Sequence, residues 1–145
     1  MSIQREDFPL PDTEWEPTRG YWEAAAAGEL RVPRCTSCAE WSWYPKEACP
    51  GCGGSEMPWT RLSGRATLFS YVVVHHAFLP QYRGLTPFLP ALVVPEEAPG
   101  IRLTTRLVDC EPGELRMDMP VEAVFRPLEF EGVDGSVVAP LFRPA

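Results

Sequence analysis

The alternation of apolar and polar positions after Trp59 predicts a domain built from short β-strands. Residues 65–76 form the longest such run, with β-branched and aromatic side chains at alternate positions. The two predicted faces are Thr67, Phe69, Tyr71 and Val73 on one side and Ala66, Leu68, Val72 and Val74 on the other. Further strands are predicted at residues 88–94, 101–108, 121–129 and 137–143, between prolines and glycines. Such strands favour a small closed Greek-key barrel, because closure leaves no unpaired edges.

One amphipathic helix is predicted before the strands, over residues 18–30. Thr18 is suited to cap its start and Gly28 to end it. The apolar face at helical spacing consists of Tyr21, Trp22, Ala25 and Ala26. A lone helix needs a surface to cover this stripe, so we interpret the aromatic pair as packing, with a ligand platform as the alternative.

Two segments carry apolar side chains without a regular period. In the N-terminal arm, residues 1–17, Phe8 and Trp15 stand among prolines and acids, so we expect the arm to lie against its own domain or a partner. The second segment is the loop 77–86, with Phe78, Leu79, Tyr82, Arg83 and Leu85. Either this loop folds over the mouth of the barrel or a partner covers it.

Four cysteines form two Cys-x-x-Cys pairs separated by ten residues: Cys35, Cys38, Cys49 and Cys52. This spacing predicts a structural zinc site, because four thiolates can meet at one tetrahedral ion. Two disulfides or free core cysteines are the alternatives, and neither explains two matched pairs outside a secretory context. Iron would use the same sulfurs, but no partner redox motif accompanies them. Four thiolates saturate zinc, so the site holds structure without activating water.

The chain around these pairs predicts a ribbon. Strands are expected at residues 30–34 and 41–45, and a glycine after each knuckle would let backbone amides face the sulfurs. Ala39 stands where the first of those glycines is expected, so a less tight turn is predicted there. Trp41, Trp43 and Tyr44 are expected to shield the metal from water.

Composition narrows the function classes. The chain has 145 residues, about one domain or two very small ones, and its 20 acids outnumber its 13 basic residues. An acidic chain gains little from phosphate contacts, which disfavours generic nucleic-acid binding. The sequence contains neither an apolar run long enough for a bilayer nor a signal-peptide pattern. We therefore expect a cytoplasmic protein.

The sequence contains no recognisable catalytic constellation. His75 and His76 are adjacent on a predicted strand, so their side chains point to opposite faces. Cys110 lies between Asp109 and Glu111, whose charges raise the pKa of a thiol and make a nucleophile improbable. No serine elbow, phosphate loop or metal-histidine motif occurs.

Arginines are the remaining polar side chains that could bind a ligand. Arg31 and Arg34 flank the ribbon, and Arg65 opens the first barrel strand. Such side chains can bind the phosphates of a nucleotide-like ligand, with solvated surface charge as the alternative.

The order of these parts resembles a known family. The shared stretches are Gly28-Glu29-Leu30, Arg31-Val32-Pro33-Arg34, both cysteine pairs, Leu62-Ser63-Gly64-Arg65 and Met119-Pro120-Val121-Glu122. They resemble the zinc-ribbon plus OB-fold family catalogued as domain of unknown function number thirty-five, from about Thr18 to the C-terminus. Ala39 departs from the family pattern.

The resemblance implies a mainly β fold: an arm and helix (1–30), a rubredoxin-like zinc ribbon (31–60) and a five-stranded OB-fold barrel (61–145). It also implies a non-catalytic accessory subunit of an acyl-CoA-processing complex, assembled with a thiolase-fold enzyme or steroid side-chain aldolase. Acyl-CoA would lie near the junction of ribbon and barrel, with its phosphates at Arg31, Arg34 and Arg65. We expect the partner interface to include Trp22, Phe78, Leu79, Tyr82 and Leu85. The alternatives are a single-stranded nucleic-acid module and an iron-containing electron carrier.

Overall fold

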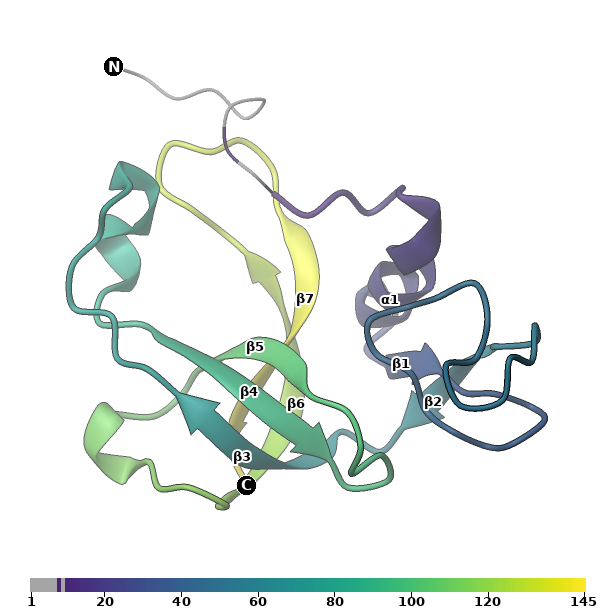
Figure 1. Cartoon of the computed structure of the whole chain (residues 1–145). Coiled ribbons are helices and arrows are strands. Elements are labelled where there is room, and N and C mark those ends of the chain that lie inside the picture. Colours follow the sequence, from purple (N-terminus) through teal and green to yellow (C-terminus); the bar gives the residue numbers. More distant parts are fainter. Residues whose placement is uncertain (1–7, 9) are drawn as a thin grey trace.

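A computed structural model describes Phe8 and residues 10–145. The elements, in chain order, are α1 (Glu16–Ala26), β1 (Leu30–Pro33), β2 (Trp59–Leu62), β3 (Arg65–Tyr71), the 3₁₀ helix η2 (Pro80–Leu85), β4 (Leu89–Pro95), β5 (Leu103–Leu107), the 3₁₀ helix η3 (Pro112–Glu114), β6 (Pro120–Leu128) and β7 (Val137–Pro144). Figure 1 shows a barrel beside a smaller unit made of α1, β1, β2 and long loops. The predicted fold class, mainly β with one N-terminal helix, a ribbon and a five-stranded barrel, is confirmed.

The barrel closes in the strand order β3-β4-β5-β7-β6, with β6 pairing back onto β3. The five predicted barrel strands are all present, with ends shifted by up to five residues. Burial alternates strictly along β4, as expected for a strand with one face toward a core. The largest fully buried side chains include Leu68, Val93, Leu103 and Phe142. The closed barrel thus encloses one continuous apolar core.

The β5–β7 seam is the only parallel pairing among the described strands, and it has a single Cα pair, Leu107↔Phe142. The amide of Val108 extends it by donating to the Phe142 carbonyl oxygen at 2.9 Å. Antiparallel ladders elsewhere are longer, with eight Cα pairs between β6 and β7. Few backbone hydrogen bonds therefore join β5 to β7.

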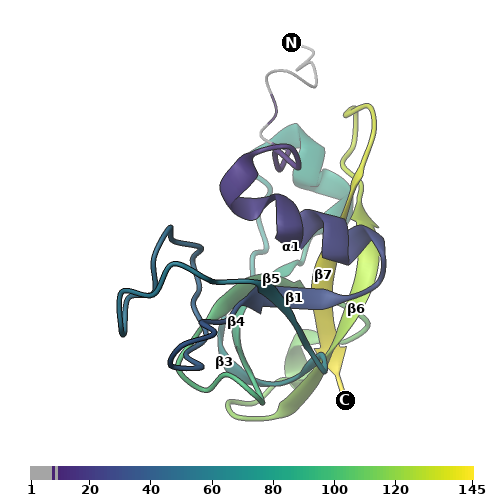
Figure 2. The same ribbon diagram turned by 90° about the vertical axis from the view of Figure 1, so that its right-hand side faces the viewer.

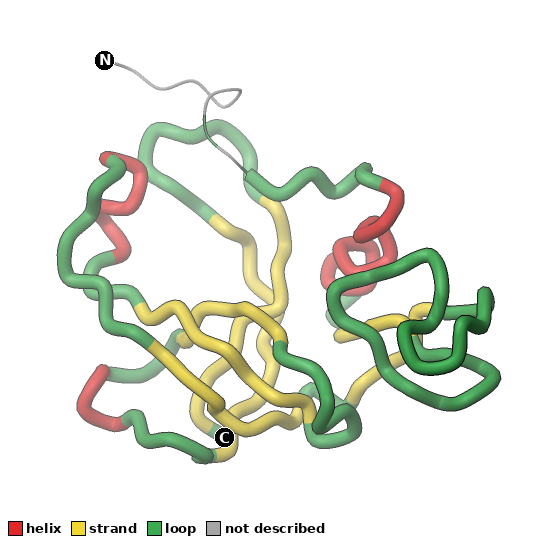
Figure 3. Tube along the Cα trace, in the orientation of Figure 1, coloured by secondary structure: helices red, strands yellow, loops and turns green. Residues whose placement is uncertain are grey.

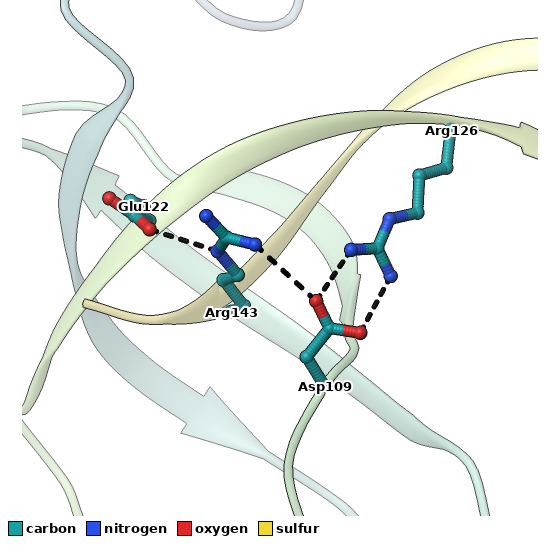
Figure 4. A network of polar contacts seen from close by, with 4 residues as sticks. All are labelled: Asp109, Glu122, Arg126 and Arg143. Atoms are coloured by element: carbon teal, nitrogen blue, oxygen red, sulfur yellow. Dashed lines mark hydrogen bonds and ion pairs between the residues drawn. The ribbon is translucent and has the colours of Figure 1, made fainter.

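An ionic network lies directly beyond the seam (Figure 4). Asp109, just after β5, accepts two hydrogen bonds from Arg126 of β6, one of them at 2.7 Å. Arg143 of β7 lies 3.6 Å from the Asp109 carboxylate and donates to Glu122 at 2.9 Å. The hydrogen bonds from Arg126 hold the pKa of Asp109 below its usual value. These side chains connect the end of β5 to its neighbour β7 and to β6, the next strand beyond it.

The first barrel strand is shorter than predicted, and its inward face changes partway. The register between β3 and β4 shifts between Leu68 and Ser70. A bulge of this kind adds one residue and reverses which side chains point inward. Beyond it Tyr71 and Val73 pack against the core, whereas Val72 is 56% exposed. The prediction that Val72 shares a face with Leu68 is therefore wrong.

Helix α1 begins earlier than predicted. Thr18 is a buried helical residue, not the cap, and Trp15 precedes the helix without a capping hydrogen bond from its side chain. The helix starts at Glu16, and Pro17 follows in the first turn, which its fixed φ suits. Gly28 ends it as predicted, with a φ of 76°. The buried face contains Tyr21, Ala24 and Ala25, whereas the predicted Ala26 is exposed.

Helix α1 lies across β1, as Figure 2 shows. Gly20 is the point of closest approach to β2, because a Cβ built on it would lie 2.4 Å from two ring atoms of Trp59. Tyr21 belongs to the same buried cluster as Leu30 and Leu62 of the ribbon sheet and Leu68 of the barrel. The helix, ribbon sheet and barrel therefore share one core.

The ribbon between β1 and β2 is mostly loop (Figure 3). The predicted return strand at residues 41–45 is wrong, since only one bridge forms there, between Arg34 and Trp41. The next tryptophan, Trp43, turns toward α1 and packs on Tyr21 with ring centroids 4.8 Å apart. The packing of Trp43 on the helix therefore directs the chain away from β1, and the strand pairing that begins at Trp41 does not continue.

Within the described residues, no helix combines the length and apolar character that crossing a membrane requires.

Candidate metal centre and the ribbon–barrel junction

The four cysteines of the ribbon converge on one point. Their Sγ atoms all lie within 4.8 Å of one another, with Cys35–Cys52 at 3.6 Å and Cys38–Cys49 at 3.5 Å. Sulfurs about 2.3 Å from a tetrahedral zinc ion would be about 3.8 Å apart, whereas a disulfide requires about 2.05 Å. The geometry fits a four-thiolate metal site, and the cysteines are not paired as disulfides. The predicted ligand set is thus brought together.

The two knuckles are built alike. The amide of Ala39 donates to the Cys35 carbonyl oxygen at 2.9 Å, and that of Gly53 donates to the Cys49 carbonyl oxygen at the same distance. Ala39 has a φ of 63° and Gly53 a φ of 78°, so both occupy the left-handed region. The expectation of a less tight turn at Ala39 is wrong, because the alanine adopts the glycine conformation.

Backbone amides face the sulfurs, as a thiolate site needs. The amide of Gly51 donates to Cys49 Sγ at 3.3 Å. The amides of Cys38 and Ser37 lower the pKa of the Cys35 thiol to about 6, whereas burial and the neighbouring sulfurs raise the pKa of Cys38 and of Cys52. Four sulfurs this close cannot all be thiolates without a cation among them, which a metal supplies. A Cβ on Gly54 would lie 3.2 Å from Cys35 Sγ, so only glycine lets the chain pass this close. The residues present therefore fit a structural zinc ion.

Two aromatic residues of the ribbon pack toward helix α1. Trp43 packs on Tyr21, and Tyr44 stacks with Trp15 at 6.3 Å. Of the metal-site cysteines, Cys38 and Cys52 are exposed, while Cys35 and Cys49 are buried. That Trp41, Trp43 and Tyr44 shield the metal stays a prediction.

Each of the three candidate phosphate-binding arginines already has a partner within the chain. Arg31 donates to Glu29 at 2.7 Å, and Arg65 donates to Glu96 at 2.6 Å. Arg34 donates to the carbonyl oxygen of Ala39 and lies over the ring of Trp41. The Arg65 side chain is 70% exposed and Arg31 38%, so ligand access at both positions remains open.

The loop predicted to be an interface divides into two parts. Phe78 is 87% exposed and Leu79 41%, and the ring of His76 packs edge-on against Phe78. Tyr82 and Leu85, within η2, are only partly exposed. Tyr82 stacks on Phe88 at 5.1 Å. The first part is open for a partner, and the second folds over its own barrel.

Neither His75 nor Cys110 joins a catalytic arrangement among the described residues. His75 and His76 are both exposed. Burial raises the pKa of the Cys110 thiol, and the charges of Glu114, Asp109 and Glu111 raise it further. The cysteine is therefore a poor nucleophile, with burial as a cause additional to the predicted acids.

Aromatic side chains from distant segments meet at the junction of helix, ribbon and barrel. Phe8 of the arm is buried against Phe130, with ring centroids 4.8 Å apart, and Tyr82 packs on both. This confirms for Phe8 the expectation that the arm lies against its own domain; residues 1–7 and 9 are outside the described part. A cavity of about 480 Å³ lies here, and Arg106 of β5 is among its lining residues.

Comparison with known proteins identifies the family. A DUF35 domain-containing scaffold protein of Methanocaldococcus jannaschii is 35% identical over 105 residues, covering 72% of each chain. The chain belongs to the DUF35 family. A probable enoyl-CoA hydratase alpha subunit of Thermomonospora curvata is 33% identical over 86% of this DUF35 chain. The chain spans about a third (36%) of the length of that subunit.

Family models cover both parts of this DUF35 chain. Residues 22–58 match the rubredoxin-like zinc ribbon domain of ChsH2, and residues 59–126 match its C-terminal OB-fold domain. A solved structure, the Ltp2-ChsH2(DUF35) aldolase, superposes with a TM-score of 0.77 and 28% identity, over 94% of this chain and 98% of that one. The predicted family and its zinc-ribbon plus OB-fold architecture are confirmed. The division at residues 30 and 60 stays a prediction.

Proposed function

We propose that this chain is a non-catalytic accessory subunit of an acyl-CoA-processing enzyme complex. The observation that carries the proposal is the structural match over 98% of the DUF35 chain of an aldolase that also contains Ltp2. The enoyl-CoA hydratase relative supports an acyl-CoA substrate, and the scaffold relative supports a structural role. On this proposal the partner is a thiolase-fold enzyme or steroid side-chain aldolase.

The closed metal site agrees with a structural role. Four thiolates fill the coordination sphere of zinc, which leaves no position for a water or substrate. Zinc would fix the loops between β1 and β2, which have little regular structure of their own. The ribbon would then hold the helix and the barrel in a fixed relative position, so that both can contact a partner.

The interface is proposed around Phe78 and Leu79. Apolar side chains this exposed commonly mark contact surfaces, and Val72, 56% exposed on the same connection from β3, extends the patch. Tyr82 and Leu85 would support the patch from η2, and Trp22 would contribute from α1. A partner covering these residues removes apolar surface that the chain alone leaves in water.

Acyl-CoA is proposed as a ligand shared between the subunits. Its phosphates would lie at Arg31, Arg34 and Arg65, replacing or supplementing the present partners of these side chains. Isothermal titration of the complex with acyl-CoA tests this idea. Unchanged affinity after Arg31→Ala and Arg34→Ala would remove both residues from the site, without affecting the proposal of an accessory subunit.

Co-expression with a thiolase-fold enzyme tests the accessory role. The two chains should co-purify as one complex, and Phe78→Asp should disrupt it by placing a charge in an apolar contact. Met117→Asp is the matched control, since Met117 is 56% exposed and follows η3, away from η2 in Figure 1. If the chain stays alone with every such enzyme, the proposal is wrong.

A further inference from the structure

The cavity at the ribbon–barrel junction has the size of a ligand site. Its volume of about 480 Å³ falls within the range of about 300–1,000 Å³ that is usual for pockets of small molecules. In Figure 1, α1 and η2 stand on either side of the end of the barrel at which the cavity lies. The lining comes from both of them, from the ribbon loop and from β4, β5, β6 and β7.

Two aromatic clusters form much of the wall. One contains Tyr82, whose ring lies 5.1 Å from Phe88 and 5.1 Å from Phe130. The other belongs to the ribbon–helix contact, where Tyr21 packs 4.8 Å from Trp43. Faces of this kind bind flat or extended apolar groups, and in each cluster the rings pack against one another.

Arg106 is the only charged residue among those described that line this cavity. Burial lowers its pKa, and the structure shows no ion pair or hydrogen bond from its guanidinium to any described residue. By contrast, six other arginines have an acid within 4 Å: Arg19, Arg31, Arg61, Arg65, Arg126 and Arg143. A partly buried cation with no opposite charge among the described residues is costly, so the position favours an anionic ligand.

The cavity offers one cation and many apolar groups. A ligand with several phosphates would leave most of its charge unpaired here, whereas one carboxylate matches one guanidinium in a bidentate pair. The Thr105 hydroxyl is not free to bind the ligand, because it already donates to the Pro140 carbonyl oxygen at 3.1 Å. We propose that this cavity binds a hydrophobic monocarboxylate, with its carboxylate at Arg106 and its apolar body between the two aromatic clusters.

Calorimetric titration of the zinc-loaded chain tests the proposal, with pyrenebutyrate as the anionic probe and pyrenebutanol as its uncharged counterpart. Pyrenebutyrate should bind more tightly. Arg106→Gln should weaken its binding by about tenfold or more, since a charge-assisted pair is lost, and leave pyrenebutanol unchanged. Arg83→Gln removes the same charge from an exposed position on η2 and should change neither.

A second variant tests the location. Thr104 is exposed and lines the cavity, so Thr104→Trp fills the space without touching the core and should abolish binding of both probes. The proposal is overturned if the native chain does not bind pyrenebutyrate, or if Arg106→Gln and Arg83→Gln behave alike. It is also overturned if Arg106→Gln impairs only assembly with a partner enzyme, because the anion would then come from that protein. Each titration uses the chain alone, so its outcome is independent of whether the proposed complex forms.

Discussion

Replacing Gly20 by alanine reverses the usual effect of that substitution. In the interior of a helix, glycine to alanine normally stabilises by about 1 kcal/mol, because alanine loses less backbone entropy on folding. Here the new Cβ would lie 2.4 Å from Cε2 and Nε1 of Trp59, where ordinary contacts begin at 3.4 Å. Either the Trp59 ring or helix α1 must therefore shift by about 1 Å to admit it.

Overpacking of this kind costs about 1–3 kcal/mol, or more when backbone must move. Set against the helical gain, we expect Gly20→Ala to destabilise the chain by up to about 2 kcal/mol. The corresponding fall in melting temperature is up to about 6 °C for a domain of this size. Thermal unfolding followed by circular dichroism, with zinc in excess, measures it.

Two variants make the result decisive. Gly84→Ala is the control, because a Cβ there meets nothing within 4 Å; its melting temperature should stay constant or rise. In a Trp59→Ala background, which opens the space, Gly20→Ala should be stabilising, so a double-mutant cycle should show coupling. A higher melting temperature for Gly20→Ala in the native background would refute the packing of α1 on β2.

Three further outcomes are expected. Removing zinc with a chelator should release hydrogen-exchange protection in residues 34–57 while the barrel strands keep theirs, because bound metal contributes on the order of 10 kcal/mol to such ribbons; equal loss in both would contradict this. Ala39→Gly should leave denaturant stability unchanged or raise it by up to about 1 kcal/mol, because relief of the left-handed φ outweighs the entropy of glycine; a clear loss would show that the Ala39 turn is unstrained. Arg126 lowers the pKa of Asp109 in the folded chain, so the stability that this carboxylate contributes is present above its unfolded pKa of about 3.9 and is lost as the pH falls through the folded value. Asp109→Asn should thus lower stability only slightly at pH 7, since both side chains are about 40% exposed, and the difference should vanish in acid; a difference that persists there would exclude the ion pair as its cause.

The sequence predicts the strands and the metal ligands well, because both depend on short-range patterns. The cysteine spacing determines the ligand set, and apolar runs between prolines and glycines mark the barrel strands. Local patterns fail where tertiary contacts intervene. The shift between Leu68 and Ser70 reverses the inward face, and the packing of Trp43 on Tyr21 ends the expected return strand. Neither contact has a signature in neighbouring residues.

Arg106 shows the same limit for the site. In the sequence it stands between Thr105 and Leu107 on a strand whose polar positions are expected to face water. The outer face of β5 becomes the wall of a cavity only because α1, which precedes β5 in the chain, and η2, which comes from a different segment, both pack near it. The abundance of aromatic residues in the loop 77–86 and in the ribbon was the available signal, but it did not indicate which strand they would cover.

Turnover of acyl-CoA measured for this chain alone, for a partner enzyme alone and for the two together tests the proposed accessory role most directly. The account predicts no turnover by this chain, and a rate for the mixture that exceeds that of the partner alone and falls when Phe78→Asp prevents assembly. Turnover by this chain alone, or a partner rate that its presence leaves unchanged, would contradict the account.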